Sequence, residues 1–246
     1  MKKIERTLFW FRDGHEKKSF LNDSFFCLGT LLNRLLNEKY DEKKIKFINI
    51  DFSSDETYKL FPTNPMNYIH YYGAGGGHLH YYGVIDFLDF NKLSDIEKKK
   101  LIWKKSYEYL QESAKKIKNE SLFVASEYAY NQGIILNFNP DYRMVETEIF
   151  IHEQSIKASI WVNFRKEGMF SIFTLEKDGQ ILFEKDIDNT QNGVEFFLEM
   201  YKEIEFKNNI ITIKGRKDVD NLPLKITLLP ENIEKIERVI KSNINH

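Results

Sequence analysis

The sequence predicts an α+β protein with an N-terminal β-α-β segment, a long central pair of helices, an antiparallel β-meander and a C-terminal helix. Two observations predict this class. Apolar residues recur every three or four positions through much of the first half, and at alternate positions from residue 142 onward. The period changes near Pro140, which divides the chain into an α/β half, residues 1–139, and a β-rich half, residues 140–246. We expect the two halves to pack together.

The opening segment is predicted to form a strand, a helix and a second strand. The first strand covers residues 4–11, and a turn signal follows it. Leucine and phenylalanine residues at helical spacing predict a helix over residues 21–37, with Asn22 or Asp23 as its N-cap. The second strand covers residues 45–52, where apolar and polar residues alternate.

Residues 53–83 are rich in glycine and proline, so we expect most of this stretch to be irregular. Alternation of apolar and polar residues predicts a strand over residues 78–90. Ser94 and Glu97 form a capping box at the start of a helix. A further helix is predicted over residues 120–133. The helix after the capping box carries an apolar stripe that we expect to be buried, made of Ile96, Trp103, Tyr107, Leu110, Ala114 and Ile117.

The helix that carries this stripe is rich in lysine. Eight lysines and two glutamates lie between residues 98 and 118, spread over a broad arc that is typical of a solvated face. The whole chain has 36 basic and 37 acidic residues, which argues against a nucleic acid partner. Ile102 and Tyr109 fall outside the stripe, so we expect a second contact there, with the C-terminal sheet or with a partner.

The second half is predicted to be a meander closed by further strands. Its four strands lie near residues 143–151, 156–165, 169–176 and 180–187, with an Asp-Gly turn before the last one. A short helix is predicted within residues 192–204. Two strands near residues 209–214 and 222–228 are expected to close the sheet, and a terminal helix starts at Pro230 and runs through Ile233, Ile236 and Ile240.

The most unusual segment is residues 70–83, in which His-Tyr-Tyr-Gly occurs twice around a run of glycines. It lacks the third glycine of a dinucleotide fingerprint and the Gly-Lys-Ser/Thr of a phosphate-binding loop. A metal site is one interpretation, and it would make the protein a metal-dependent hydrolase. Its ligands would be His70, His78, His80 and Asp86. We favour a segment of amphipathic rings, because two histidines at this spacing are a motif of low specificity.

Binding of another protein is the function that accounts for the unusual residues together. Tyrosine and tryptophan offer large contact areas at low entropic cost, and they anchor many protein interfaces. Several such residues lie in predicted loops or on polar strand faces. The candidate partner-binding residues are Tyr71, Tyr72, Tyr81, Tyr82 and Trp161.

The sequence identifies no catalytic residue and no cofactor site. It has no Gly-x-Ser-x-Gly, and its single cysteine, Cys27, lies in a predicted apolar helix. Glu146 and Glu148 share one strand face, but acidic residues are common on the wet side of an antiparallel sheet. No secretory leader or membrane span is recognised, so we expect a cytoplasmic protein without a membrane partner.

The order of a lysine-rich helix, a second helix, a meander with an Asp-Gly turn and the segment 194–201 resembles bacterial immunity proteins encoded beside polymorphic toxins. The resemblance spans residues 86–215 and transfers no functional residue. It implies a cytoplasmic, non-enzymatic protein that binds one cognate toxin. The residues and the resemblance together predict a protein-binding function. A hydrolase using the histidine segment and a self-associating structural subunit are the alternatives.

Overall fold

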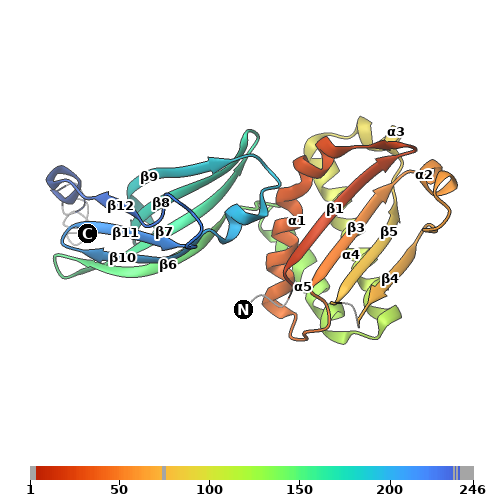
Figure 1. Ribbon diagram of the computed structural model, residues 1–246, viewed down its shortest axis with the longest axis horizontal. Helices are drawn as coiled ribbons and strands as arrows, with labels where there is room; N and C mark the ends of the chain where they lie inside the picture. Colours follow the sequence, from red (N-terminus) through yellow and green to blue (C-terminus); the bar gives the residue numbers. More distant parts are fainter. Residues whose placement is uncertain (1–3, 74–75, 235, 237, 239–246) are drawn as a thin grey trace. The chain divides into compact units, whose positions relative to one another are not determined.

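The computed structural model describes residues 4–73, 76–234, 236 and 238 (Figure 1). The predicted α+β class is confirmed, with helices and strands both abundant. The chain forms two compact units, Met1–Pro140 and Asp141–His246, and each is described by itself. Among the described residues, no helix is both long and apolar enough to cross a membrane.

The N-terminal unit is built on a mixed five-stranded sheet with the strand order β2-β1-β3-β5-β4. The three central strands are parallel, and the two edge strands are antiparallel to their neighbours. The predicted first two strands are confirmed as β1 and β3. The strands are β1 (Arg6–Asp13), β2 (Glu16–Lys17), β3 (Phe47–Ser53), β4 (Tyr68–Tyr72) and β5 (His78–Val84).

Five helices accompany this sheet: α1 (Ser19–Lys39), α2 (Asp55–Leu60), α3 (Phe87–Lys92), α4 (Asp95–Ile117) and α5 (Glu120–Ile135). α1 packs on β1, and α4 packs on β4 and β5, on the same face of the sheet (Figure 1). α5 packs against both of these helices. The predicted helices at residues 21–37 and 120–133 are therefore confirmed, as is the long helix between them.

Alternate residues of the central strands form the core beneath these helices. Phe11 contacts Phe25 of α1 with ring centroids 5.3 Å apart, and Phe52 contacts Tyr109 of α4 at 6.0 Å. These contacts join the sheet to both helices in one cluster. The buried strand residues of this face include Phe9, Phe11, Ile48, Ile50, Phe52, Leu79 and Tyr81.

The start of α1 differs from the prediction. Its N-cap is Lys18 and neither Asn22 nor Asp23. The side-chain oxygen of Asn22 instead accepts a hydrogen bond from the backbone N–H of Phe11 at 3.0 Å. Asn22 therefore links the helix to β1, a long-range role that local capping patterns do not reveal.

The capping box at the start of α4 is confirmed, since the Glu97 carboxylate accepts from the backbone N–H of Ser94 at 2.8 Å. Ile96, however, is 41% exposed, because the first turn of α4 precedes the packed part of the helix. Tyr107 and Ile117 are partly buried. The fully buried members of the predicted stripe are Trp103, Leu110 and Ala114.

The second contact predicted for α4 is made with the N-terminal sheet, because Ile102 and Tyr109 are buried within their own unit. Ile102 is fully buried, and the ring of Tyr109 stacks on Tyr81 at 4.1 Å. The Tyr109 hydroxyl donates to the Val84 carbonyl and accepts from the Val84 N–H, both at 3.1 Å. The ring lies so close to β5 that a Cβ on Gly83 would come within 2.3 Å of it. α4 contacts both the sheet and α5, so one stripe could not describe its burial.

The stretch predicted to be irregular contains α2 and β4, and the strand predicted to reach residue 90 ends at Val84. Ser54 caps α2 by accepting from the N–H of Thr57. Asp86 caps α3 by accepting from the N–H groups of Leu88 and Asp89, at 2.8 and 3.2 Å. Both helices have only six residues, which is too short to establish a helical period in the sequence.

The C-terminal unit contains the predicted meander, β6 (Tyr142–Ile151), β7 (Gln154–Arg165), β8 (Gly168–Lys177) and β9 (Gln180–Thr190), as one antiparallel sheet. Asp178 and Gly179 both have positive φ, as a tight hairpin turn between β8 and β9 requires. The strands β10 (Tyr201–Lys207), β11 (Ile210–Gly215) and β12 (Leu224–Thr227) form a separate sheet and do not close the meander.

The two helices predicted for this unit have different outcomes. The predicted short helix is a 3-10 helix, η1 (Glu195–Glu199), and the rest of that segment forms β10, which contacts β6 (Figure 1). The hydroxyl groups of Ser171 and Tyr201 are 3.0 Å apart and join β8 to β10. The terminal helix begins at Pro230 as predicted, while Ile240 lies outside the described residues.

Candidate binding face of the N-terminal sheet

The face of the N-terminal sheet opposite α1 and α4 carries three rows of side chains, each crossing β1, β3, β5 and β4. We call these twelve residues the open face. Trp10, Tyr68 and Tyr72 on it are 43%, 41% and 53% exposed. In Figure 1 this face is seen with the helices behind the sheet. The rows are Arg6-Phe47-His78-Tyr72, Leu8-Asn49-His80-His70 and Trp10-Asp51-Tyr82-Tyr68.

Aromatic rings on the open face stack on one another. His70 and Tyr72 have ring centroids 3.8 Å apart, and His80 and Tyr82 stack at 4.2 Å with 16° between their planes. Phe47 stacks in the same way on a histidine of β5 at 4.5 Å. In each pair, one face of a ring packs against the neighbouring ring. The polar tips of the rings can therefore be held in place before any partner arrives, which lowers the entropic cost of binding.

Two side-chain hydrogen bonds, one at Trp10 and one at His80, orient further groups on this face. The Trp10 indole N–H donates to the Asn49 side-chain oxygen at 3.0 Å. Nε2 of His80 lies 2.9 Å from Oδ1 of Asp51, and both side chains are partly exposed. Burial, and then the charge of Asp51, raises the pKa of Tyr82, so its hydroxyl stays a neutral donor at ordinary pH.

Of the four candidate tyrosines, the structure places Tyr72 and Tyr82 on the open face and the other two on the helix side. Tyr72 is 53% exposed, but Tyr82 is only 8% exposed, so the expectation of an accessible side chain is wrong for Tyr82. Tyr81 is only 2% exposed, and its hydroxyl donates to the Glu112 carboxylate. Burial, and then this hydrogen bond, raises the pKa of Tyr81. The Tyr71 hydroxyl donates to the Lys44 carbonyl at 2.9 Å. The expectation that Tyr81 contributes to an exposed surface is therefore wrong, because successive strand residues point to opposite faces.

The candidate metal ligands are only partly brought together. His70 and His80 are direct neighbours across β4 and β5, and His78 lies one row away, stacked on a phenylalanine. Asp86 is not on this face, because it follows β5 and caps α3. Within the part of the chain that the structure describes, no group of three or more His, Cys, Asp or Glu side chains could hold a metal ion.

Trp161 lies in the C-terminal unit, apart from the tyrosines with which it was grouped. Its indole N–H donates to the Thr174 hydroxyl at 3.1 Å, and the Arg143 guanidinium lies 4.6 Å from its ring centroid. Arg143 also pairs with Glu176 at 2.7 Å. The ring is thus held within its own sheet and is only partly exposed. A partner could reach only a fraction of it.

The two glutamates that share a face of β6 have local partners. Glu146 forms ion pairs with Arg143 at 3.6 Å and Lys157 at 3.8 Å. Glu148 accepts a hydrogen bond from the Ser155 hydroxyl at 3.1 Å. These contacts fit the wet, charged side of an antiparallel sheet, which is the interpretation that the sequence favoured.

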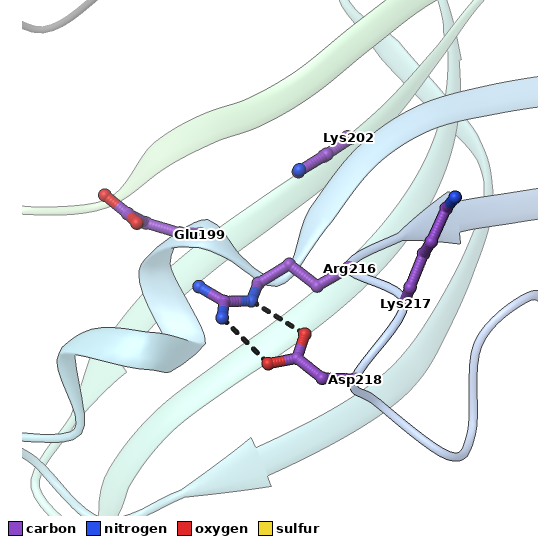
Figure 2. Close-up of a pocket in the computed structure, with 5 residues that line it drawn as sticks. All are labelled: Glu199, Lys202, Arg216, Lys217 and Asp218. Carbon is purple, nitrogen blue, oxygen red and sulfur yellow. Dashed lines mark hydrogen bonds and ion pairs between the residues drawn. The ribbon is translucent and has the colours of Figure 1, made fainter.

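A hollow of about 440 Å³ lies on the C-terminal unit beside η1 and β10 (Figure 2). Within it the Arg216 guanidinium makes two hydrogen bonds to the Asp218 carboxylate, at 3.0 and 2.8 Å. Both side chains are well exposed, so solvent screens their charges. No pattern in the sequence predicted this hollow. Its lining residues are Glu199, Lys202, Arg216, Lys217 and Asp218.

Sequence reasoning missed most of the open face. Trp10, Asn49 and Asp51 alternate with buried residues on β1 and β3, a signal that was present in the predicted strands. Tyr68 was missed because β4 itself was not predicted. No local pattern reveals that these residues share rows with the histidines, since the rows depend on strand order.

Comparison of the chain with protein-family models, with curated proteins and with solved structures gave no match.

Proposed function

We propose that this protein acts by binding another protein through the open face of its N-terminal sheet. The observation that carries the proposal is the row arrangement of stacked tyrosine and histidine rings beside an exposed tryptophan on a solvent-facing sheet. Rigid aromatic side chains with polar tips are the residue types that dominate binding energy at protein interfaces. Trp10, Tyr68 and Tyr72 are the principal anchors of this proposed interface.

The chemistry of the face favours a protein over a nucleic acid strand. Proteins that bind single strands stack bases on exposed ring faces and follow the backbone with a basic groove. Here the paired rings use flat faces on each other, and the chain carries a net charge of −1. Hydroxyl and imidazole tips instead suit hydrogen bonds to peptide groups and side chains, with Trp10 supplying apolar contact.

The resemblance to immunity proteins supports a narrower form of this proposal, in which the partner is a toxin that the protein neutralises. That form predicts that a toxin gene lies beside the gene for this chain. Neutralisation would then require only that the open face cover the toxin's active or docking surface. The broader proposal of protein binding stands independently of this identification.

A photo-crosslinking experiment tests the broader proposal. A photoreactive phenylalanine replaces Tyr72 on the open face, and in a matched control it replaces Phe150, which is 64% exposed on the C-terminal unit. The variants are expressed with the products of the neighbouring genes. We expect a specific crosslinked protein from position 72 and none from position 150. A crosslink from position 150 alone would place the interface elsewhere.

The partner found in this way allows the anchors to be measured. We expect Trp10→Ala or Tyr72→Ala to weaken its affinity by about 2 kcal/mol or more, which is roughly 30-fold, at one or both positions. Charge reversal at Lys104 on α4 is the control and should leave the dissociation rate unchanged. Full affinity in both aromatic variants would refute the open face as the site. Growth rescue in cells that produce the neighbouring toxin tests the narrower form.

A further inference from the structure

The two edges of the N-terminal sheet differ in how their backbone groups are covered. On the β1 side, β2 pairs only with Arg12 and Asp13. Side chains of α1 cover parts of the remainder. Asn22 accepts from the N–H of Phe11 at 3.0 Å, and Asn37 both accepts from the N–H of Ile4 and donates to its carbonyl, at 2.9 and 2.8 Å. The two ends of this edge are therefore covered, by β2 and Asn22 at one end and by Asn37 just before β1 at the other.

α1 also approaches the middle of this edge closely. A Cβ on Gly29 would lie 2.9 Å from the carbonyl oxygen of Thr7, so the helix backbone sits directly beside the strand. The Thr7 hydroxyl donates to the side-chain oxygen of Asn33 at 3.0 Å. α1 thus lies against this edge and bonds to one backbone group of β1, the N–H of Phe11, and covering an edge with a helix is one way in which proteins protect it.

The opposite edge, β4, has a different composition. Its sequence is Tyr-Ile-His-Tyr-Tyr, with no lysine, glutamate or proline, the residues that usually keep edge strands apart. Within the described residues, β5 is the only strand that pairs with β4. A positive charge reaches β4 from α4, where the Lys116 ammonium group lies 4.7 Å from the ring centroid of Tyr68. Nothing in the strand's own side chains opposes the addition of another strand.

We propose that the β4 edges of two copies of this chain pair antiparallel about a two-fold axis at His70. The strand's five residues are self-complementary in this arrangement. Tyr68 would lie opposite Tyr72 of the second copy on the open face. Ile69 would lie opposite Tyr71 of the second copy on the helix side, and the two His70 side chains would face each other. Aromatic and aromatic–aliphatic pairs are favourable in directly opposed strands.

A second copy fits this edge better than an unrelated strand for two reasons. A two-fold axis at His70 opposes Tyr68 with Tyr72 and Ile69 with Tyr71, so every opposed pair away from the axis joins an aromatic ring to another ring or to an aliphatic side chain. It also carries no charge that would select a partner of opposite sign. Pairing would join the two sheets into one and make their open faces continuous. The five-residue contact is small, so we expect a reversible dimer and not a permanent one.

Sedimentation of the purified full-length chain across the micromolar range tests this inference. We expect a concentration-dependent dimer. His70→Lys would place two like charges opposite each other at the axis and should raise the dimer dissociation constant at least about tenfold. His78→Lys is the matched control, because it puts the same charge on the same face one strand further in, and it should leave dimerisation unchanged. Thermal melts verify that both variants are folded.

Disulfide trapping locates the contact directly. In a Cys27→Ser background, His70→Cys should form a covalent dimer on mild oxidation, and His78→Cys should not. A chain that is monomeric at every concentration, or a dimer that His70→Lys leaves intact, would overturn the proposal. A monomer whose binding to another protein is lost on His70→Lys would assign the edge to a foreign strand. Because His70 also lies on the open face, this assignment holds only if Trp10→Ala and His78→Lys, on other strands of that face, keep full binding; loss in all three variants would point to the open face and not to the edge.

Discussion

The two faces of the N-terminal sheet are made by alternating residues of the same strands, yet they differ in burial and in composition. On β3, Ile50 and Phe52 are buried under the helices, while Asp51 between them reaches partly into solvent. Parallel strands are usually covered on both faces and are apolar throughout. Here one face keeps that character and the other carries polar and aromatic groups. Stability is therefore concentrated on the covered face, and we place recognition on the open face.

The largest expected effect on stability belongs to the covered face. Leu110 of α4 is 1% exposed within the N-terminal core, so Leu110→Ala removes packed atoms and leaves a cavity. We expect a loss of about 2–5 kcal/mol in the free energy of unfolding, measured by denaturant titration. Trp10→Ala on the open face provides the comparison and should cost far less. Unfolding of the Leu110 variant at the wild-type midpoint would mean that the covered face is not the source of stability.

A smaller effect is expected when a polar contact of the covered face is lost. Tyr109→Phe removes the hydroxyl that bonds to both the N–H and the carbonyl of Val84. These backbone groups lie at the end of a buried strand, and the loss should cost about 1–3 kcal/mol. Chemical denaturation measures it, with Tyr128→Phe on α5 as the control, because the Tyr128 hydroxyl donates to the Glu38 carboxylate at a solvent-exposed position. An equal change in the two variants would contradict a special role for the Tyr109 hydroxyl.

The same hydroxyl predicts how stability changes at alkaline pH. Burial raises the pKa of Tyr109 to about 12, above its ordinary value of 10.0. The native state therefore holds the phenol proton more tightly than the unfolded chain does. The contribution of the Tyr109 hydroxyl to the free energy of unfolding is complete below pH 10 and is lost as the pH rises toward about 12. Tyr109→Phe should show a shallower alkaline loss in melts followed by circular dichroism. A slope identical to that of the wild type would refute this assignment.

The smallest effect on folding is expected on the open face itself. Asp51→Asn weakens the contact with His80, but both side chains are partly exposed, so the free energy of unfolding should change by less than about 1 kcal/mol. The affinity for the crosslinked partner should fall more than the stability does, because the imidazole loses its orienting group. If the variant unfolds as readily as Leu110→Ala, the open face is structural and the contrast between the two faces disappears.

Local patterns in the sequence predicted several elements well. The period of the apolar residues located β1, α1, β3, α4, α5 and the meander, because these elements are long enough to repeat their pattern. The capping box at Ser94 is a contact between near neighbours, and the structure contains it. Short elements such as α2, α3 and β4 were missed, since five or six residues cannot establish a period.

The candidate site was predicted less completely than the fold. The sequence drew attention to residues 70–83, and two of the four tyrosines chosen there do lie on the open face. The alternation predicted in this segment already placed Tyr81 with the apolar residues and Tyr82 with the polar ones, so the choice of Tyr81 ran against a local pattern. Trp10 and Asp51 were not chosen, since they are far from the segment in the sequence and join it only through strand pairing.

By itself, therefore, the sequence determined the α+β class, the order of the long elements and the alternation within the strands, which are local properties of periodicity and capping. The tertiary structure alone decided that β5 lies between β3 and β4, that α1 lies against one sheet edge, and that twelve side chains share one face. The physical reason is that these features depend on contacts between residues tens of positions apart. No local pattern of hydrophobicity or charge encodes which of several strands becomes the neighbour.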